Sequence, residues 1–225
     1  MGDAPLILQT PSDNFGPRRD GLRPELIVLH YTAMTSAEAA LERLCDPEAE
    51  VSAHYLICAR GRVFQMVDEG MRAWHAGAGT WQGKDDINSR SVGIELDNRG
   101  DHPFSEPQMA ALETLLPAIM VRWNIPPAGI IGHSDMAPGR KIDPGPRFDW
   151  RRLARQGLAV WPHDHPADGA ASDTWRDLAS RFGYPMDEPE GSLNAFRARF
   201  RPWATGPLDA EDLRIMTKLT NVRSA

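Results

Sequence analysis

Two apolar runs of six residues constrain the fold more than any other feature of this sequence. Leu26–Tyr31 reads LIVLHY and Ser91–Leu96 reads SVGIEL, and in both the apolar residues do not simply alternate with polar ones. A strand of this kind is buried on both faces, as the central strands of a parallel or mixed sheet are. The two runs therefore predict the middle of a sheet that helices cover on both sides.

Further elements alternate with these two strands. Ser52–Cys58 and Arg62–Val67 favour a pair of strands joined by a tight turn, and Ile130–His133 favours one more short strand. Capping-box patterns that begin at Thr35 and at Ser105 each predict the start of a helix. We therefore expect an α/β fold with a mixed central β-sheet flanked by helices.

The chain of 225 residues has room for one main domain and a small appendage. Residues 1–24 are rich in Pro, Gly, Asp and Arg, which favours a loop that wraps around the surface of a domain over 1–160. Residues 161–172, WPHDHPADGAAS, have the composition of a linker. Residues 173–225 predict a small module of three amphipathic helices, over Thr174–Phe182, Ser192–Phe200 and Asp209–Leu219.

Composition excludes several classes of protein. With 31 acidic and 25 basic side chains the net charge is -6, which is the wrong sign for neutralising phosphates, so we expect no nucleic-acid partner. Cys45 and Cys58 are too few for a disulfide framework and too far apart for a metal knuckle, so both are expected to be reduced thiols.

Membrane and targeting signals are not found in the sequence. No window reaches the roughly 20 apolar residues that a membrane span needs, and the first twenty residues contain no apolar run of secretory length. We therefore expect no membrane partner and a cytoplasmic location, or a periplasmic one if the chain is a trimmed mature form. The sequence does not indicate the oligomeric state.

Histidines end two of the predicted strands. His30 and His133 occupy these positions, and Asp143 follows ten residues after the second. Two imidazoles and one carboxylate can hold zinc with a fourth position open, where the ion lowers the pKa of its water to about 7 and polarises a carbonyl group. Because these residues are scattered along the chain, their spacing leaves open that each histidine is a hydrogen-bonded core residue.

Two further residues have a role in this interpretation. Glu95 is a carboxylate inside an apolar strand, where burial is costly without a task or a partner, and it suits a general base. Lys141 precedes Asp143 by two residues, so both side chains lie on one side of an extended segment and the ammonium can stabilise an oxyanion. The alternatives are that Glu95 pairs with an arginine and that Lys141 is a solvated surface charge.

Six segments occur along the chain in this order: LIVLHYT, VSAHYLI, GRVFQMV, RAWHAG, NSRSVGIEL and GHSDMAPGRKIDPGPRF. Over about residues 20–160 the chain thereby resembles the zinc-dependent N-acetylmuramoyl-L-alanine amidases related to peptidoglycan-recognition proteins. The resemblance implies a mixed sheet flanked by helices and cleavage of the amide between the lactyl group of N-acetylmuramic acid and L-alanine of the stem peptide. It also implies zinc at His30, His133 and Asp143, with Glu95 and Lys141 as the catalytic pair.

The remaining histidines fall into two groups. His54 in SAHYL, and His75 with Trp74 in AWHAG, lie in motifs similar to those of the family, which predicts that the three side chains line the substrate groove. For each of these histidines a purely structural hydrogen bond stays an equal alternative. Outside such motifs, His163 and His165 of the linker are expected to be solvated, and His102 carries no functional signal.

The C-terminal segments FGYP, AFRARFRP and GPLDAEDL resemble the three-helix peptidoglycan-binding module found in one branch of these amidases. The alternative is a helical cap that covers the catalytic domain, because a module this small has little core of its own.

The expected function is zinc-dependent hydrolysis of muropeptides, in their 1,6-anhydro form, during peptidoglycan recycling. Recycling is expected because a cytoplasmic enzyme meets imported wall fragments and not the intact wall. Two alternatives stay open, an envelope amidase that acts on intact peptidoglycan and a non-catalytic peptidoglycan receptor. The presence of all three ligand positions favours an enzyme.

Overall fold

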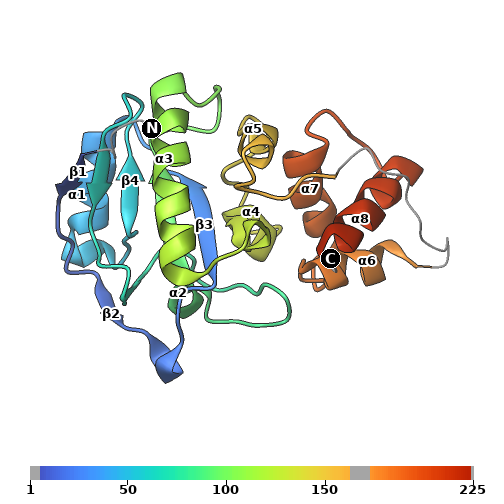
Figure 1. Cartoon of the computed structure of the whole chain (residues 1–225), viewed down its shortest axis with the longest axis horizontal. Coiled ribbons are helices and arrows are strands. Elements are labelled where there is room, and N and C mark those ends of the chain that lie inside the picture. Colours follow the sequence, from blue (N-terminus) through green and yellow to red (C-terminus); the bar gives the residue numbers. More distant parts are fainter. Residues whose placement is uncertain (1–5, 163–172, 224–225) are drawn as a thin grey trace.

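The computed structural model describes residues 6–162 and 173–223 (Figure 1). Its centre is a six-stranded sheet in the order β1-β5-β4-β7-β3-β8. The strands are β1 (Ile7–Gln9), β3 (Leu26–Tyr31), β4 (Tyr55–Ile57), β5 (Val63–Gln65), β7 (Ser91–Leu96) and β8 (Ile130–Gly132). Neighbouring strands are parallel except β4 and β5, which are antiparallel, so the predicted mixed sheet is confirmed.

The helices cover both faces of this sheet. They are α1 (Ala37–Cys45), α2 (Ile87–Arg90), α3 (Glu106–Trp123), α4 (His133–Met136), α5 (Trp150–Arg155), α6 (Trp175–Phe182), α7 (Pro189–Phe200) and α8 (Ala210–Arg223), with 3-10 turns at Arg19–Gly21, Pro47–Ala49 and Pro127–Gly129. The predicted cap at Ser105 is confirmed, because its hydroxyl accepts a hydrogen bond from the Gln108 amide. The cap predicted at Thr35 is wrong by one residue, because Ser36 accepts the bond from the Ala39 amide instead.

Strand β3 is buried on both faces, as its sequence predicts. Ile27 and Leu29 lie in the hydrophobic cluster that includes Leu112 and Leu116 of α3. Val28 lies in a different cluster, with side chains from the C-terminal helices. Successive side chains of a strand point to opposite faces, so the single run LIVL supplies apolar side chains to both layers of the core.

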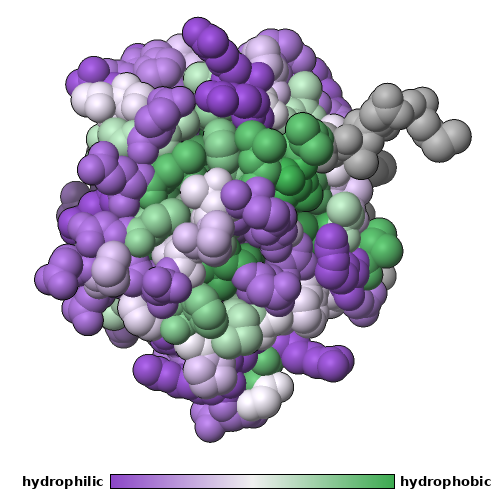
Figure 2. All heavy atoms as spheres, turned by 90° about the vertical axis from the view of Figure 1, so that its left-hand side faces the viewer, coloured by the Kyte–Doolittle hydropathy of each residue, from purple (hydrophilic) through white to green (hydrophobic). Residues whose placement is uncertain are grey.

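The N-terminal segment is not a loop throughout, contrary to the prediction. Strand β1 adds to the edge of the sheet beside β5, and β2 (Phe15–Pro17) pairs antiparallel with β6 (Met71–Ala73). Both strands have three residues, too few to give a periodic pattern in the sequence. On the face of the molecule beside α1 and β1, apolar side chains lie among polar ones (Figure 2), and Leu6 next to β1 is 79% exposed.

Three helices lie within residues 173–223, as predicted, and they pack against the rest of the molecule. Figure 1 shows α4 and α5 between the sheet and helices α6, α7 and α8. Phe196 and Phe200 of α7 share one hydrophobic cluster with Val28, Ile131 and Met136. The division into domain, linker and module stays a prediction, and this core is continuous across it.

Three further predictions concern the linker, the two cysteines and the capacity to cross a membrane. Most of the predicted linker, with His163 and His165, lies outside the described residues. Cys45 and Cys58 are free, and Cys58 is buried. Within the described ranges, no helix combines the length and the apolar character that crossing a membrane requires.

Candidate active site

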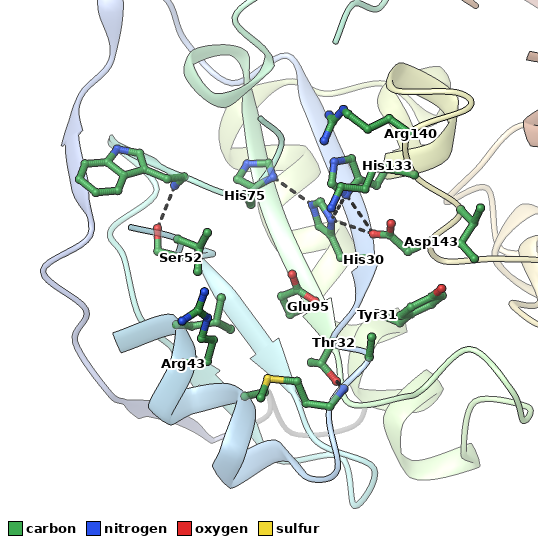
Figure 3. A pocket seen from close by; sticks show the side chains of 18 residues that line it. His30, Tyr31, Thr32, Arg43, Ser52, His75, Glu95, His133, Arg140 and Asp143 are labelled. Carbon is green, nitrogen blue, oxygen red and sulfur yellow. Dashed lines mark hydrogen bonds and ion pairs between the residues drawn. The ribbon is translucent and has the colours of Figure 1, made fainter. Parts of the chain in front are cut away.

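A pocket of about 390 Å³ lies at the carboxyl ends of β3 and β7 (Figure 3). Its lining includes all five residues that the sequence analysis assigned to chemistry: His30, Glu95, His133, Lys141 and Asp143. The strand register explains part of this convergence, because His30 of β3 pairs directly with Glu95 of β7. The polar residues of two apolar strands thus lie side by side at one edge of the sheet.

His30, His133 and Asp143 direct one atom each toward a common point. The Nδ1 atoms of His30 and His133 are 2.9 Å apart, and Asp143 Oδ2 lies 3.0 Å from the first and 3.1 Å from the second. Ligand atoms that share one tetrahedral zinc ion lie about 3.3 Å apart, given bond lengths near 2.0 Å. Among the described residues, these three form a group that could hold a metal ion.

Local sequence brings His133 and Asp143 together. His133 does not end β8 as predicted but begins the short helix α4, because β8 stops at Gly132. The Ser134 amide donates a hydrogen bond of 2.9 Å to the Asp143 carbonyl oxygen, which ties the two ligand segments to each other. A Cβ atom at Gly132 would lie 2.7 Å from Pro144 Cδ, so the glycine permits this close approach.

Hydrogen bonds around the two histidines determine which ring nitrogen carries the proton. The Ser91 hydroxyl donates to the Ile87 carbonyl oxygen, so its oxygen accepts from His75 Nε2 at 3.1 Å. His75 Nδ1 then accepts from His30 Nε2 at 3.0 Å, and this leaves a lone pair on His30 Nδ1.

The second ligand histidine is oriented in the same way. His133 Nε2 donates to the Ala76 carbonyl oxygen at 2.9 Å, and in the neutral ring the lone pair is on Nδ1. Ligating histidines are typically held by such a bond from the other ring nitrogen. The chain therefore fixes both lone pairs toward Asp143.

The electrostatics of the group fit a divalent cation. Burial, with His133 nearby, lowers the pKa of His30 to about 4, so the ring is neutral at pH 7. Although burial opposes it, the neighbouring His133 and His30 rings hold the pKa of the Asp143 carboxyl below its usual value, so it is ionised. Two lone pairs and a carboxylate oxygen that face one another repel unless a cation lies between them. The residues present therefore fit a metal ion.

Glu95 lies beside this group with an unsatisfied oxygen. Its Oε2 atom is buried and has no hydrogen-bond partner among the described residues. Burial and, to a smaller extent, the charge of Asp143 raise the pKa of the Glu95 carboxyl to about 8, against the opposing effect of Lys141. A carboxylate tuned this close to neutrality is suited to take up and release a proton.

The three residues predicted to line the substrate groove have different positions. Trp74 and His75 line the pocket, and His75 also contacts the ligand His30. His54 is not in the lining of this pocket: its buried ring accepts from the Gly93 amide and donates to the Met71 carbonyl oxygen. Its place in the substrate groove stays a prediction. Both ring nitrogens of His54 are thus occupied within the fold.

Sequence reasoning missed the contact between His75 and its surroundings. The ring packs so closely on β7 that a Cβ atom at Gly93 would lie 2.4 Å from His75 Cγ. The available signal was Gly93 itself, because an isolated glycine inside a strand often marks the close approach of another group. Two cationic side chains of the lining, Arg43 and Arg140, were also missed because surface arginines carry no distinguishing pattern.

We expect that replacing His75 with alanine weakens metal binding by about 10- to 100-fold, because the group that orients His30 is removed. The measurement is the dissociation constant for Zn²⁺, determined by competition with a chromophoric chelator. His102→Ala serves as the control, because the exposed ring of His102 bonds to the neighbouring Asp101 side chain and lies outside the pocket lining. Equal affinity in the His75 and His102 variants contradicts this account of the ring.

A family model described as N-acetylmuramoyl-L-alanine amidase matches residues 20–146. The chain is 36% identical over 230 residues to N-acetylmuramoyl-L-alanine amidase AmiD of Escherichia coli strain K12, a match that covers 88% of this chain and 82% of that protein. It is 35% identical over 162 residues to 1,6-anhydro-N-acetylmuramyl-L-alanine amidase AmpD of Haemophilus influenzae, covering 64% of this chain and 88% of that one.

Two solved structures share the fold across most of the chain. One is AmiD from E. coli in complex with anhydro-N-acetylmuramic acid-L-Ala-D-gamma-Glu-L-Lys, with a TM-score of 0.81, 34% identity and 91% of both chains covered. The other is AmpDh3 from Pseudomonas aeruginosa in complex with anhydromuramic pentapeptide, with a TM-score of 0.80, 32% identity, and 91% of this chain and 94% of that one covered. The matches, together with the group of His30, His133 and Asp143 beside Glu95, show that the chain belongs to the N-acetylmuramoyl-L-alanine amidase family.

Proposed function

We propose that this chain is a zinc-dependent amidase that cleaves 1,6-anhydro-muropeptides between the muramyl lactyl group and L-alanine, in peptidoglycan recycling. The observation that carries the proposal is the convergence of His30, His133 and Asp143 beside Glu95 in one pocket. The substrate class is supported by the similar proteins named as anhydro-muramyl amidases and by the similar structures that hold anhydromuramyl peptides.

Zinc is the metal that this set of donors favours. Two imidazoles and one carboxylate are a common set for catalytic zinc, and three protein ligands would leave a fourth coordination position for water or substrate. When bound, zinc acts as a Lewis acid on the amide carbonyl and lowers the pKa of a coordinated water.

The side chains around the ligands perform the proton transfers. Glu95 takes a proton from the attacking water and returns it to the alanine nitrogen as the carbon–nitrogen bond breaks. Lys141, which also lines the pocket, donates to the oxygen that becomes negative during the attack. The products are a lactyl carboxylate on the sugar and a stem peptide with a free amino terminus.

The rest of the lining suits a muropeptide. Trp74 provides an apolar surface that can face a sugar or a peptide stem, and the cation Arg43 lies on the wall opposite the histidines (Figure 3). A stem peptide carries carboxylates, which a cation at this position attracts. A non-catalytic receptor is not favoured, since the ligand group and the proton-transfer carboxylate are all present.

One incubation series tests the proposed function. The purified protein is given anhydro-muropeptides, the same peptides on reducing-end sugars, and intact sacculi, and free stem peptides are identified by mass spectrometry. We expect release of peptide from the soluble anhydro fragments, loss of release after chelation, and restoration by Zn²⁺. Release from sacculi alone contradicts the recycling role, and no release from any substrate contradicts the amidase. The cytoplasmic location stays a prediction, which fractionation of cells that express the native protein tests.

We expect Lys141→Ala to lower kcat by about 10²-fold, because one donor to the developing oxyanion is lost. KM changes little, since the ground-state carbonyl carries much less charge than the transition state. Steady-state kinetics on an anhydro-muropeptide measure both constants. Lys218→Ala, on the distant helix α8, is the matched control. A loss of less than a few fold in the Lys141 variant removes this side chain from the reaction.

A further inference from the structure

The segment that carries His133 packs against the C-terminal helices on the side away from the pocket. Helix α4 has four residues, and His133, Ser134, Asp135 and Met136 are all buried. His133 faces the pocket, whereas Asp135, two residues later, contacts side chains from the α6–α7 connection and from α7.

Asp135 connects three parts of the chain. One carboxylate oxygen accepts hydrogen bonds from the Gly132 amide and from Arg199 Nη1, both at 2.8 Å. The other accepts from the Tyr184 hydroxyl, also at 2.8 Å. The backbone directly before His133 is thus held by a carboxylate that is itself held by two C-terminal side chains.

Arg199 holds this segment at two points. Besides its bond to Asp135, its Nη2 donates to the Ile130 carbonyl oxygen at 3.1 Å. Its guanidinium carbon lies 4.0 Å from the ring centroid of Trp150, which stacks the group against the start of α5. The two contacts lie on either side of Gly132. Since Arg199 is only 3% exposed, both contacts are shielded from water.

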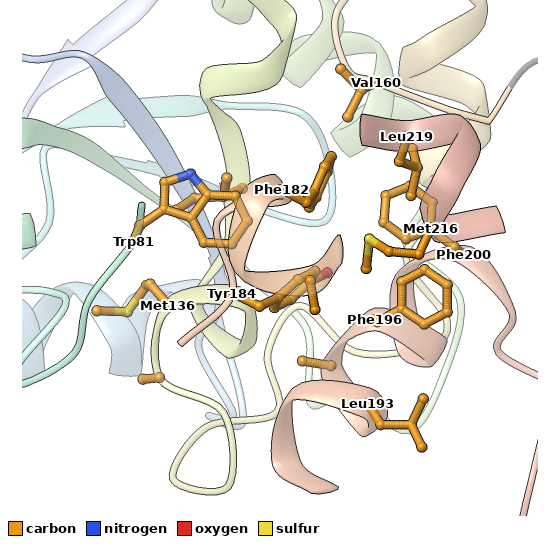
Figure 4. Close-up of a cluster of buried hydrophobic side chains, with 14 of the residues drawn as sticks. Trp81, Met136, Val160, Phe182, Tyr184, Leu193, Phe196, Phe200, Met216 and Leu219 are labelled. Atoms are coloured by element: carbon orange, nitrogen blue, oxygen red, sulfur yellow. The ribbon is translucent and has the colours of Figure 1, made fainter. Parts of the chain in front are cut away.

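Apolar packing reinforces the same contact. Met136, fully buried at the end of α4, belongs to a cluster with Trp81, Phe182, Tyr184 and Phe196 (Figure 4). Helix α7 also approaches the loop that leads to Lys141, since a Cβ atom at Gly191 would lie 2.7 Å from the Gly139 amide nitrogen. The segments after β8 that carry His133 and lead to Lys141 therefore both pack against the C-terminal helices.

We propose that Arg199 and Tyr184 are positioning residues for the metal ligand His133, and that the C-terminal helices serve as an integral support of the metal centre. The inference rests on the proposed metal site. Its physical basis is that a ligand on a four-residue helix has little rigidity of its own, and outer partners that fix a ligand alter metal affinity without touching the metal.

The chain provides a matched control for the test. Arg197, on the same helix and 4% exposed, makes a comparable buried ion pair with Asp212 of α8 and reaches the carbonyl oxygens of Gly206 and Pro207. All of these partners lie within the C-terminal helices and their loop. Loss of Arg197 therefore removes a buried pair from the same helices without removing a bond to α4.

The experiment compares Arg199→Met, Tyr184→Phe and Arg197→Met in the full chain. The dissociation constant for Zn²⁺ is measured by chelator competition, the visible spectrum of the Co²⁺-substituted protein reports the geometry of the ligands, and thermal unfolding reports stability. We expect Arg199→Met to weaken Zn²⁺ binding by about 10-fold or more and to alter the Co²⁺ bands, with a smaller change of the same kind in Tyr184→Phe. Arg197→Met lowers the melting temperature but leaves affinity within about twofold.

The outcomes separate the inference from the proposed function. Failure of the unsubstituted protein to bind Zn²⁺ refutes the metal site, whereas the ratios between variants test the positioning role. Unchanged affinity in Arg199→Met and Tyr184→Phe overturns the inference, and so does an equal loss in Arg197→Met. Should Arg199→Met fail to fold, Arg199→Lys replaces it, because lysine retains the charge next to Asp135 but cannot span both contacts of the planar guanidinium.

Discussion

Glu95→Gln is expected to lower kcat by about 10²- to 10⁴-fold, the range that general acid–base catalysis contributes. The substitution retains the size and shape of the side chain and removes only its ability to accept and return a proton. Zn²⁺ content stays that of the unsubstituted protein, because Glu95 is not one of the three converging residues. Steady-state kinetics on an anhydro-muropeptide, together with metal analysis of the same sample, measure both effects.

Two observations distinguish this role from a structural one. The buried Oε2 atom of Glu95 has no partner among the described residues, so the amide of glutamine breaks no existing bond there. Glu38→Gln is the control. Glu38 is an exposed carboxylate of α1 that pairs with Arg62, and its replacement should leave full activity. Near-normal turnover in Glu95→Gln removes this residue from the mechanism.

Asp143→Ala is expected to abolish stoichiometric Zn²⁺ binding and to reduce activity to that of the chelated, unsubstituted protein. The variant leaves two imidazoles without the charge that balances a divalent ion, and the contribution of a Lewis acid to such a reaction is several kcal/mol. Several kcal/mol corresponds to a rate loss of about 10³-fold or more. Metal analysis and kinetics after dialysis against Zn²⁺ measure the two losses.

Thermal unfolding gives a readout of the same site that does not depend on activity. A ligand that binds only the folded state stabilises it by about 4 kcal/mol at 1,000 times its dissociation constant. Zn²⁺ should therefore raise the melting temperature of the unsubstituted protein and leave that of Asp143→Ala unchanged. Asp149→Ala, which removes a helix cap six residues away, is the control and should keep the response to Zn²⁺. An undiminished response in Asp143→Ala refutes the assignment of this ligand.

Local patterns were sufficient to predict the centre of the fold. LIVLHY and SVGIEL are apolar on both faces, and both form strands in the interior of the sheet, where helices cover the two faces. The three C-terminal helices were predicted from their spacing of apolar residues, and in the structure Thr174 and Gly183 cap the first of them. The short strands β1 and β2 were missed because three residues do not establish a period.

The sequence was sufficient to predict which residues form the site, but not how those residues are arranged in space. Order and motif resemblance named His30, Glu95, His133 and Asp143, whereas their proximity depends on strand register and on a loop that returns to β8. Register is fixed by packing across the sheet, which is invisible in any one segment.

The contacts that orient the proposed ligands could not be predicted from any pattern in the sequence. The bonds from His30 to His75 and from Asp135 to Arg199 join residues 45 and 64 positions apart. Each of these side chains has an ordinary neighbourhood in the sequence. Only folding brings them together, and so the role of the C-terminal helices at the metal centre could not be derived from their composition.

The central claim is that one zinc ion is held by His30, His133 and Asp143. Anomalous diffraction from a crystal grown with Zn²⁺, recorded on both sides of the zinc absorption edge, tests it most directly. We expect one strong peak within about 2 Å of both Nδ1 atoms and of Asp143 Oδ2. A peak elsewhere on the chain, or no peak at this position in a fully loaded crystal, would contradict it.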